Sequence, residues 1–273
     1  MTLATRCFGM MMLLAAAIGS PVQAAESAPA GTVVLMTGQA SASNVDTMVM
    51  RSLQKGDAVY AGEIVSAGPN TYVNLKFSDG GLVLVRPNSR FQIEAFSNPS
   101  AAASAASTPA PAATPAPPAA AATKPAPAAP PPVLRAAEAT PTRAFFRLLK
   151  GGFRTVSGLI GKGNPDEYRI NTPVATIGIR GTDYWVILCD EMCANDPILL
   201  DNLPPGVNPQ GGVIVGVIQG NVFVINGAGK ESPVGKGQYL ITLPDGTQIY
   251  LPFEPQFIQV QPIPDPATIC TTE

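Results

Sequence analysis

Alternation of apolar and polar side chains is the clearest local pattern in the first part of the chain. In Thr71–Ser78, apolar residues at positions 73, 75 and 77 alternate with polar residues at positions 74, 76 and 78. This period of two predicts a β-strand with one buried face. The apolar run Leu82–Val85 follows Asp79-Gly80, which predicts a tight hairpin because glycine adopts positive φ without a steric penalty. Upstream, Leu53–Gly68 contains short apolar runs broken by glycines, which is typical of further short strands.

The same pattern returns in the second half of the chain. Strands are predicted at Glu167–Asn171, Ala175–Ile179, Asp183–Leu188, Val213–Ile218, Asn221–Ile225, Gln238–Leu243 and Thr247–Leu251. The segment Ala144–Leu149 fits either a strand or one helical turn, and Leu243–Gly246 (Leu-Pro-Asp-Gly) predicts a second hairpin turn. No strands alternate with long helices, so the sequence predicts an all-β fold, a rolled or solenoid-like β-sandwich of short strands.

Glycines stand before several of these alternating segments. Gly38–Ala42, Gly151–Thr155 and Gly220–Val224 each place a glycine immediately before an alternating stretch. Their spacing is not constant, so no regular repeat period follows from them. They indicate corners at which a sheet turns.

Residues 99–140 interrupt the pattern with a tract that is almost wholly alanine and proline. Such a tract has too little bulky apolar surface to offset its ordering entropy, and its prolines favour extended polyproline II. We therefore expect a disordered Ala/Pro-rich spacer. Because strand-like sequence lies on both sides, the spacer either separates two domains or interrupts one.

The first 24 residues predict a secretory signal peptide. Arg6 gives a short positive start, Phe8–Gly19 is apolar, and Val22–Ala24 supplies small residues for cleavage after Ala24. The apolar core of about a dozen residues is shorter than the roughly 20 that span a bilayer. No later stretch has the length and apolar character of a spanning helix. We expect an exported, periplasmic or secreted protein that does not span the membrane.

Composition narrows the function classes. The chain contains no histidine, which excludes Ser-His-Asp and Cys-His hydrolases and zinc sites built on histidine. Catalysis through carboxylates or lysine stays open, but no paired carboxylates stand in a convincing frame, so we expect neither an enzyme nor a cofactor. The formal charge of −2, or −3 once Arg6 is removed, lacks the basic excess of a nucleic-acid binder.

Three cysteines remain after cleavage, and an exported chain can keep a disulfide between two of them. Cys189–Cys193 is the preferred pair because both flank one short turn, although either could instead pair with Cys270. The loop 190–201 collects four acidic residues that could offer oxygens to calcium. Their spacing matches no known calcium loop, so we expect a solvated acidic loop and no metal site.

Four stretches together resemble the FecR domain family, named for the periplasmic part of the ferric citrate sensor. Leu53–Ile93, with Gly-Asp, Asp-Gly and Pro-Asn-Ser landmarks, is similar to the first half of that domain. Phe146–Gly158 resembles its central Leu-x-x-Gly strand, and Thr172–Val186 resembles its Thr-Pro…Arg-Gly-Thr signature. Gly216–Ile241 resembles its closing strands. The likeness runs from about Gly31 to Leu251, without the spacer.

The resemblance implies a division of the chain. Residues 25–98 form the first half of one FecR-like β-domain, 141–252 form the second half, and 253–273 form a Pro-rich C-terminal tail. The spacer is then an insertion at a surface turn, which is tolerable because each doubling of loop length costs only about 0.6 kcal/mol.

The signature residues Thr172, Pro173, Arg180, Gly181 and Thr182 are the candidate site, structural or partner-binding. We expect Gly181 to permit a bend or bulge where one strand ends and the next begins. Arg180 would then hold the turn by contacting a carboxylate or free carbonyls, and Thr182 would re-enter the sheet. Arg180→Ala should accordingly lower the melting temperature. The functional interpretation makes Arg180 a ligand for an anion or a partner.

The resemblance implies a non-catalytic exported domain that acts through protein–protein contact in the bacterial envelope, in a role related to signalling. The sequence carries no cytoplasmic anti-sigma helices, so we do not expect it to relay a signal to transcription by itself. The alternative is a module that binds envelope glycan or peptidoglycan. Tyr184, Trp185, Tyr239 and Tyr250 could line such a face, but alternation points one of the first two inward and favours core packing.

Overall fold

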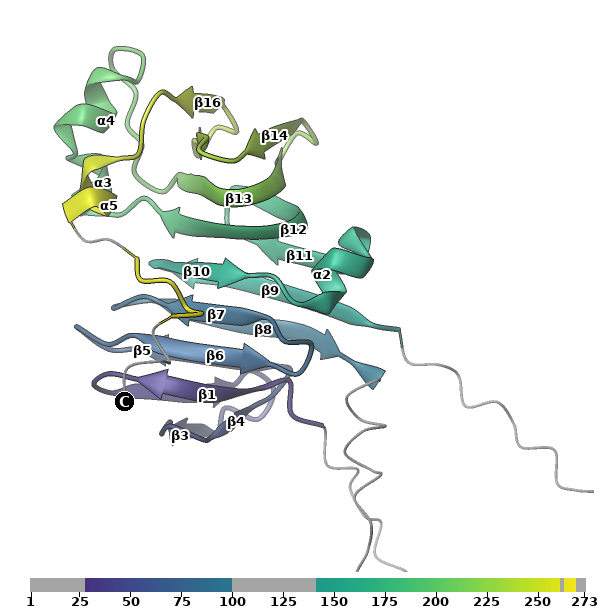
Figure 1. The fold of residues 1–273 in the computed structure, drawn as a ribbon. Helices are drawn as coiled ribbons and strands as arrows, with labels where there is room; N and C mark the ends of the chain where they lie inside the picture. Colours follow the sequence, from purple (N-terminus) through teal and green to yellow (C-terminus); the bar gives the residue numbers. More distant parts are fainter. Residues whose placement is uncertain (1–27, 100–140, 261–262, 269–273) are drawn as a thin grey trace, which may run out of the picture.

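A computed structural model describes residues 28–99, 141–260 and 263–268. Within them, sixteen strands join into one curled, mixed sheet, which confirms the all-β fold (Figure 1). The expected signal peptide, nearly all of the Ala/Pro tract and Cys270 lie outside the described residues. No helix within the described ranges has the length and apolar character that crossing a bilayer requires.

The strands are β1 (Gly31–Met36), β2 (Ala40–Asn44), β3 (Met50–Ser52), β4 (Ala58–Val59), β5 (Glu63–Ala67), β6 (Val73–Phe77), β7 (Leu82–Val85), β8 (Arg90–Ser97), β9 (Arg143–Lys150), β10 (Gly152–Val156), β11 (Tyr168–Asn171), β12 (Ala175–Leu188), β13 (Val213–Asn226), β14 (Glu231–Gly235), β15 (Tyr239–Thr242) and β16 (Gln248–Leu251). The short helices are α2 (Leu159–Gly163), the 3-10 turn η1 (Pro165–Glu167), α3 (Glu191–Ala194), α4 (Pro197–Asp201) and α5 (Gln256–Val260).

The sheet folds over itself into two layers that share β12 and β13. The first layer contains β1, β6, β7 and β10, followed by residues 183–188 of β12 and 213–219 of β13. The second layer contains β5, β8, β9 and β11, followed by residues 175–180 of β12 and 221–226 of β13. Both long strands therefore cross from one layer to the other, and among the described strands only β9 and β11 pair in parallel.

Strands on the two sides of residues 100–140 pair with each other. In the second layer β8 pairs with β9, and in the first layer β7 pairs with β10. The buried carboxyl group of Asp79 adds a further link, because it accepts hydrogen bonds from the amides of Gly81 and Ile160. Residues 28–99 and 141–260 thus contribute to the same sheet.

The main core fills the space between the layers and is rich in aromatic rings. Phe146 lies at its centre, with ring centroids 5.0 Å from Phe77, 5.3 Å from Phe91 and 5.7 Å from Tyr168. Alternation along each strand supplies these residues, since positions 144, 146 and 148 of β9 all face inward. Ala144–Leu149 is therefore a strand, not a helical turn.

A second core lies on the outer face of the first layer. Trp185 and Ile187 of β12 pack there beneath α3, α4 and α5, while Tyr184 and Val186 point into the main core. Tyr184 and Trp185 thus face opposite sides of β12, as alternation predicts, and both rings pack in a core because this strand is covered on both sides. The described part of the C-terminal tail also packs on this face, with Ile258 and Ile263 in the second core.

Two buried tyrosines make the stability of the protein sensitive to alkaline pH. Burial raises the pKa of Tyr168 to about 12 and the pKa of Tyr184 well above 10. The folded state therefore holds these protons more tightly than the unfolded chain does. Their contribution to stability should be constant below pH 10 and be lost as the pH rises through 12, roughly 3 kcal/mol in total for Tyr168.

Urea unfolding of wild type and Tyr168→Phe at pH 8 and pH 11 tests this expectation. The wild type should lose more stability between the two pH values than the variant, since the variant lacks one of the titrating groups. Equal losses in the two proteins would contradict it.

Candidate functional site

The Arg-Gly-Thr signature lies where β12 passes from one layer to the other. Gly181 has a φ of +63°, and the pairing of β12 with β13 shifts between Arg180 and Asp183. The signature is therefore a bulge within one continuous strand, not a break between two strands. Gly220 of β13 lies opposite with a φ of +84°, and a Cβ there would stand 2.6 Å from the Gly181 carbonyl oxygen. Both strands thus turn at glycines.

Thr182 is held at the bulge by a reciprocal contact with Ser157. The Thr182 amide donates to Ser157 Oγ over 2.8 Å, and the Ser157 amide donates to the Thr182 carbonyl over 3.0 Å. Thr182 is buried and does re-enter the sheet, as its position in the signature suggests.

Arg180 is exposed and lies over the ring of Phe223, 4.9 Å from the ring centroid. Among the described residues its guanidinium donates no hydrogen bond to the expected carboxylate or carbonyl groups. An exposed cation–π contact contributes about 0.5–1 kcal/mol. The melting temperature of Arg180→Ala should therefore drop only slightly, and Arg180 remains available to a ligand.

The arginine that forms hydrogen bonds across this region is Arg154 of β10, not Arg180. The sequence analysis did not select Arg154. Its Nε and Nη2 donate to both carboxylate oxygens of Asp183, at 3.0 and 2.8 Å. Its Nη1 donates to the Ile263 carbonyl at 3.1 Å, and Nη2 lies 3.7 Å from the Asp265 carboxylate. Arg154 thus joins the bulge of β12 to the C-terminal segment.

Thr172 and Pro173 lie in the turn just before β12, at the end of its 175–180 half that is away from the bulge. Thr172 closes a turn with Ala175: its hydroxyl donates to the Ala175 carbonyl at 2.7 Å and accepts from the Ala175 amide at 3.0 Å. This turn, the 226–228 turn and the 244–246 hairpin line an open cavity of about 310 Å³. Asn226 joins the last two, because its Nδ2 donates to the Gly246 carbonyl at 2.7 Å.

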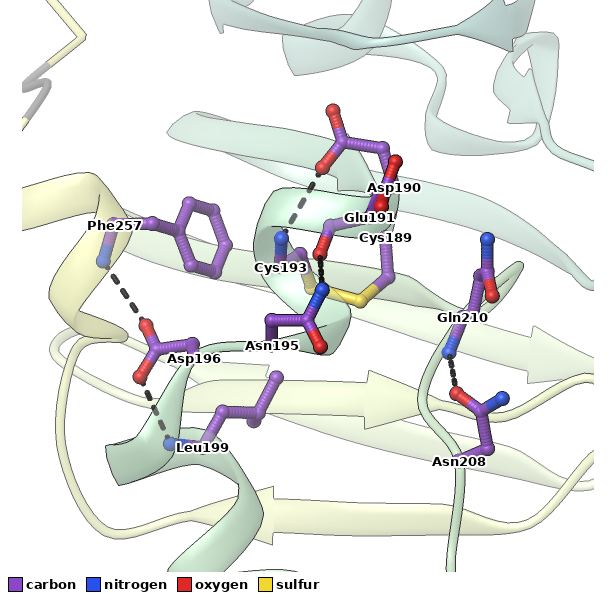
Figure 2. Close-up of a disulfide and its surroundings, with 10 residues drawn as sticks. All are labelled: Cys189, Asp190, Glu191, Cys193, Asn195, Asp196, Leu199, Asn208, Gln210 and Phe257. Atoms are coloured by element: carbon purple, nitrogen blue, oxygen red, sulfur yellow. Dashed lines mark hydrogen bonds between the residues drawn. A yellow bond between two sulfur atoms is a disulfide. The ribbon is translucent and has the colours of Figure 1, made fainter.

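The disulfide Cys189–Cys193 is confirmed, and both sulfur-bearing residues are buried in the second core (Figure 2). The acidic residues around it act as helix caps. Asp190 accepts from the Cys193 amide, and Asp196 accepts from the amides of Leu199 in α4 and Phe257 in α5 (Figure 2). Within the described residues, no three His, Cys, Asp or Glu side chains form a group that could hold a metal ion.

Four exposed apolar residues lie close together in sequence, in the hairpin that joins β2 to β3 and at the start of β3. Met48 is 85% exposed and Met50 72% exposed, and Val45 and Val49 are exposed beside them. We call these four residues the hairpin patch. Asn44 orders the tip, because its Oδ1 accepts hydrogen bonds from the amides of residues 46 and 47. The order of strands in the sheet makes β3 an edge strand.

Met48 adopts a positive φ of 56°, a conformation that is unfavourable for a side chain of its kind. Backbone strain of this kind costs of the order of 1 kcal/mol and concentrates at functional positions. Met48 thus combines an unfavourable backbone conformation with a large apolar side chain that is exposed to solvent.

No protein-family model matches the chain, and no curated protein matches it. Among solved structures, the chain is similar to two crystal structures, at 1.65 and 2.50 Å, of a putative anti-sigma factor from Parabacteroides distasonis ATCC 8503. The TM-scores are 0.41 and 0.42, and the identities are 9% and 11%. The match covers 72% of this chain in each case but 63% and 62% of the other, so this chain spans less than two thirds of those structures.

Proposed function

We propose that the protein is a FecR-like envelope domain that acts without catalysis, by binding another envelope protein in a role related to signalling. The family part of the proposal is supported by the order of the four FecR-like stretches. The Cys189–Cys193 disulfide is compatible with an oxidising compartment outside the cytoplasm.

The observation that carries the proposal is the hairpin patch. A contiguous set of exposed apolar residues marks an interaction site more often than scattered single ones do. Methionine suits such a site because its flexible, polarisable side chain adapts to different partner surfaces. The backbone of β3 pairs with β2 on one side only, so its other edge can accept a strand from a partner.

Met48→Glu combined with Met50→Glu tests the proposal in cells that express the full chain. Both side chains are exposed, so the double variant should keep the wild-type melting temperature. It should lose the protein adducts that wild type forms on chemical cross-linking of the envelope. Lys230→Glu, in the turn after β13, is the control and should keep them.

Adducts that persist unchanged in the double variant would contradict the proposal. Retention of wild type and variant alike on purified sacculi, without any protein adduct, would favour the glycan alternative. The described aromatic residues give that alternative little support, because Tyr184 and Trp185 are buried and the hydroxyl of Tyr250 donates to the Pro233 carbonyl.

A further inference from the structure

The outer face of the second layer carries a cluster of arginines and phenylalanines. Since inward positions alternate with outward ones, residues 143 and 145 of β9, 169 of β11, 178 and 180 of β12 and 223 of β13 all face outward. These are Arg143, Phe145, Arg169, Gly178, Arg180 and Phe223, which we call the basic face.

Positive charge on this layer exceeds negative charge in a protein whose formal charge is −2. Arg147 of β9 is paired, because it forms an ion pair with Glu94 of β8. Arg143, Arg169 and Arg180 differ from it. Within the described ranges, none of their three guanidiniums donates a hydrogen bond or forms an ion pair. Glu231 of β14 lies outside this group, opposite Ile225 at the margin of the layer.

Aromatic rings hold the guanidiniums of Arg143, Arg169 and Arg180 in place. Arg169 lies 4.6 Å and Arg143 5.9 Å from the centroid of Phe145, and Arg180 lies 4.9 Å from the centroid of Phe223. Stacking fixes the plane of a guanidinium and leaves its N–H groups free at the edges. Such pre-oriented groups lose less side-chain entropy when they bind a carboxylate in a bidentate manner.

Gly178 leaves a gap between the two arginines on Phe145 and the one on Phe223. The pairing register places it directly between Arg169 and Phe223 across three neighbouring strands. A Cβ built on Gly178 would meet no atom within 4 Å, so the space above it is open. The basic face therefore has a low point flanked by Arg169 on one side and by Phe223 with its stacked Arg180 on the other.

We propose that the basic face binds an extended acidic segment of a protein partner, with carboxylates on alternate residues. Arg169 and Arg180 are diagonal neighbours on antiparallel strands, with backbone positions about 7–8 Å apart, and their guanidiniums extend to opposite sides, over Phe145 and Phe223. Carboxylates on alternate residues of an extended peptide recur about every 6.6 Å along one face, so such a segment offers a row of carboxylates to the guanidiniums of the basic face. The proposal rests on the proposed function only in that the partner is a protein, and it concerns a surface separate from the hairpin patch.

A fluorescein-labelled peptide of five Glu-Thr repeats, with five Gln-Thr repeats as the uncharged control, tests the proposal by anisotropy. Wild type should bind the glutamate peptide, more weakly as salt rises, and should not bind the glutamine peptide. Arg169→Gln combined with Arg180→Gln should weaken binding by about fivefold or more. Arg147→Gln should change it less than twofold, because Arg147 is already paired with Glu94.

Gly178→Val is a second variant, which keeps the charges and fills the gap. It should weaken peptide binding while the melting temperature stays the same or rises, because valine suits a strand better than glycine does.

No binding of the glutamate peptide, or an equal loss in Arg147→Gln, would overturn the proposal. Tighter binding of polygalacturonate than of the peptide would assign the basic face to an anionic glycan and overturn it as well. If either occurs while the hairpin variants still lose their envelope adducts, only this inference fails and the proposed function stands.

Discussion

Replacing Phe146 by alanine should destabilise the protein by about 3–5 kcal/mol, the range for removing a large aromatic ring from a core. Phe146 is almost fully buried, and its ring contacts Phe77, Phe91 and Tyr168, which come from strands on both sides of residues 100–140. The loss is a large share of the 5–15 kcal/mol by which domains are stable. Urea unfolding followed by tryptophan fluorescence measures it, since Trp185 is the only tryptophan.

Leu149→Ala is the matched control, three residues further along the same strand. Leu149 is exposed on the outer face, so its removal should cost less than 1 kcal/mol. Similar losses in Phe146→Ala and Leu149→Ala would show that β9 does not place alternate residues in the core.

Replacing Arg154 by alanine should cost about 3 kcal/mol and release the C-terminal segment. Arg154 and Asp183 are 11% and 15% exposed, so the variant leaves a nearly buried carboxylate without its partner. Ile263 and Asp265 lose their contacts with the guanidinium at the same time. Hydrogen exchange should accelerate at residues 263–268, and the unfolding midpoint should fall.

Arg147→Ala tests the effect of burial on an arginine–carboxylate pair. Arg147 pairs with Glu94 but is 48% exposed, so its loss should cost at most about 1 kcal/mol. A larger loss in Arg147→Ala than in Arg154→Ala would contradict the role given to Arg154.

Local patterns predicted the elements that depend on neighbouring residues. Asp79-Gly80 and Asp245-Gly246 form turns, with glycines at φ of +84° and +85°. Strand β7 begins and ends at the predicted residues, Leu82 and Val85. The glycines before the alternating stretches, Gly38, Gly151 and Gly220, all adopt positive φ. Each of these features follows from two or three adjacent residues, which is why sequence alone could give them.

Contacts between distant segments could not be predicted in the same way. Asp183 and Ile263 are 29 and 109 residues from Arg154, and nothing near Arg154 in the sequence marks them as its partners. The packing of the C-terminal tail on the first layer was missed for the same reason. One signal was present: Tyr184–Leu188 is an unbroken apolar run, which is typical of a strand buried on both faces.

The basic face could not be predicted from the sequence either, because its residues come from four strands between positions 143 and 223. Only the register places Gly178 between Arg169 and Phe223. Sequence analysis had selected Arg180 for its place in a signature, and the structure adds the ring on which it lies.

β7 pairs with β10 and β8 pairs with β9, so two stretches that are separate in the sequence complete one sheet. A protease site placed within residues 105–135 of the otherwise unchanged chain allows the purified protein to be cut once between them. The two fragments should then co-elute on gel filtration and unfold together in a single thermal transition. Fragments that separate without denaturant, each with its own cooperative transition, would contradict the account.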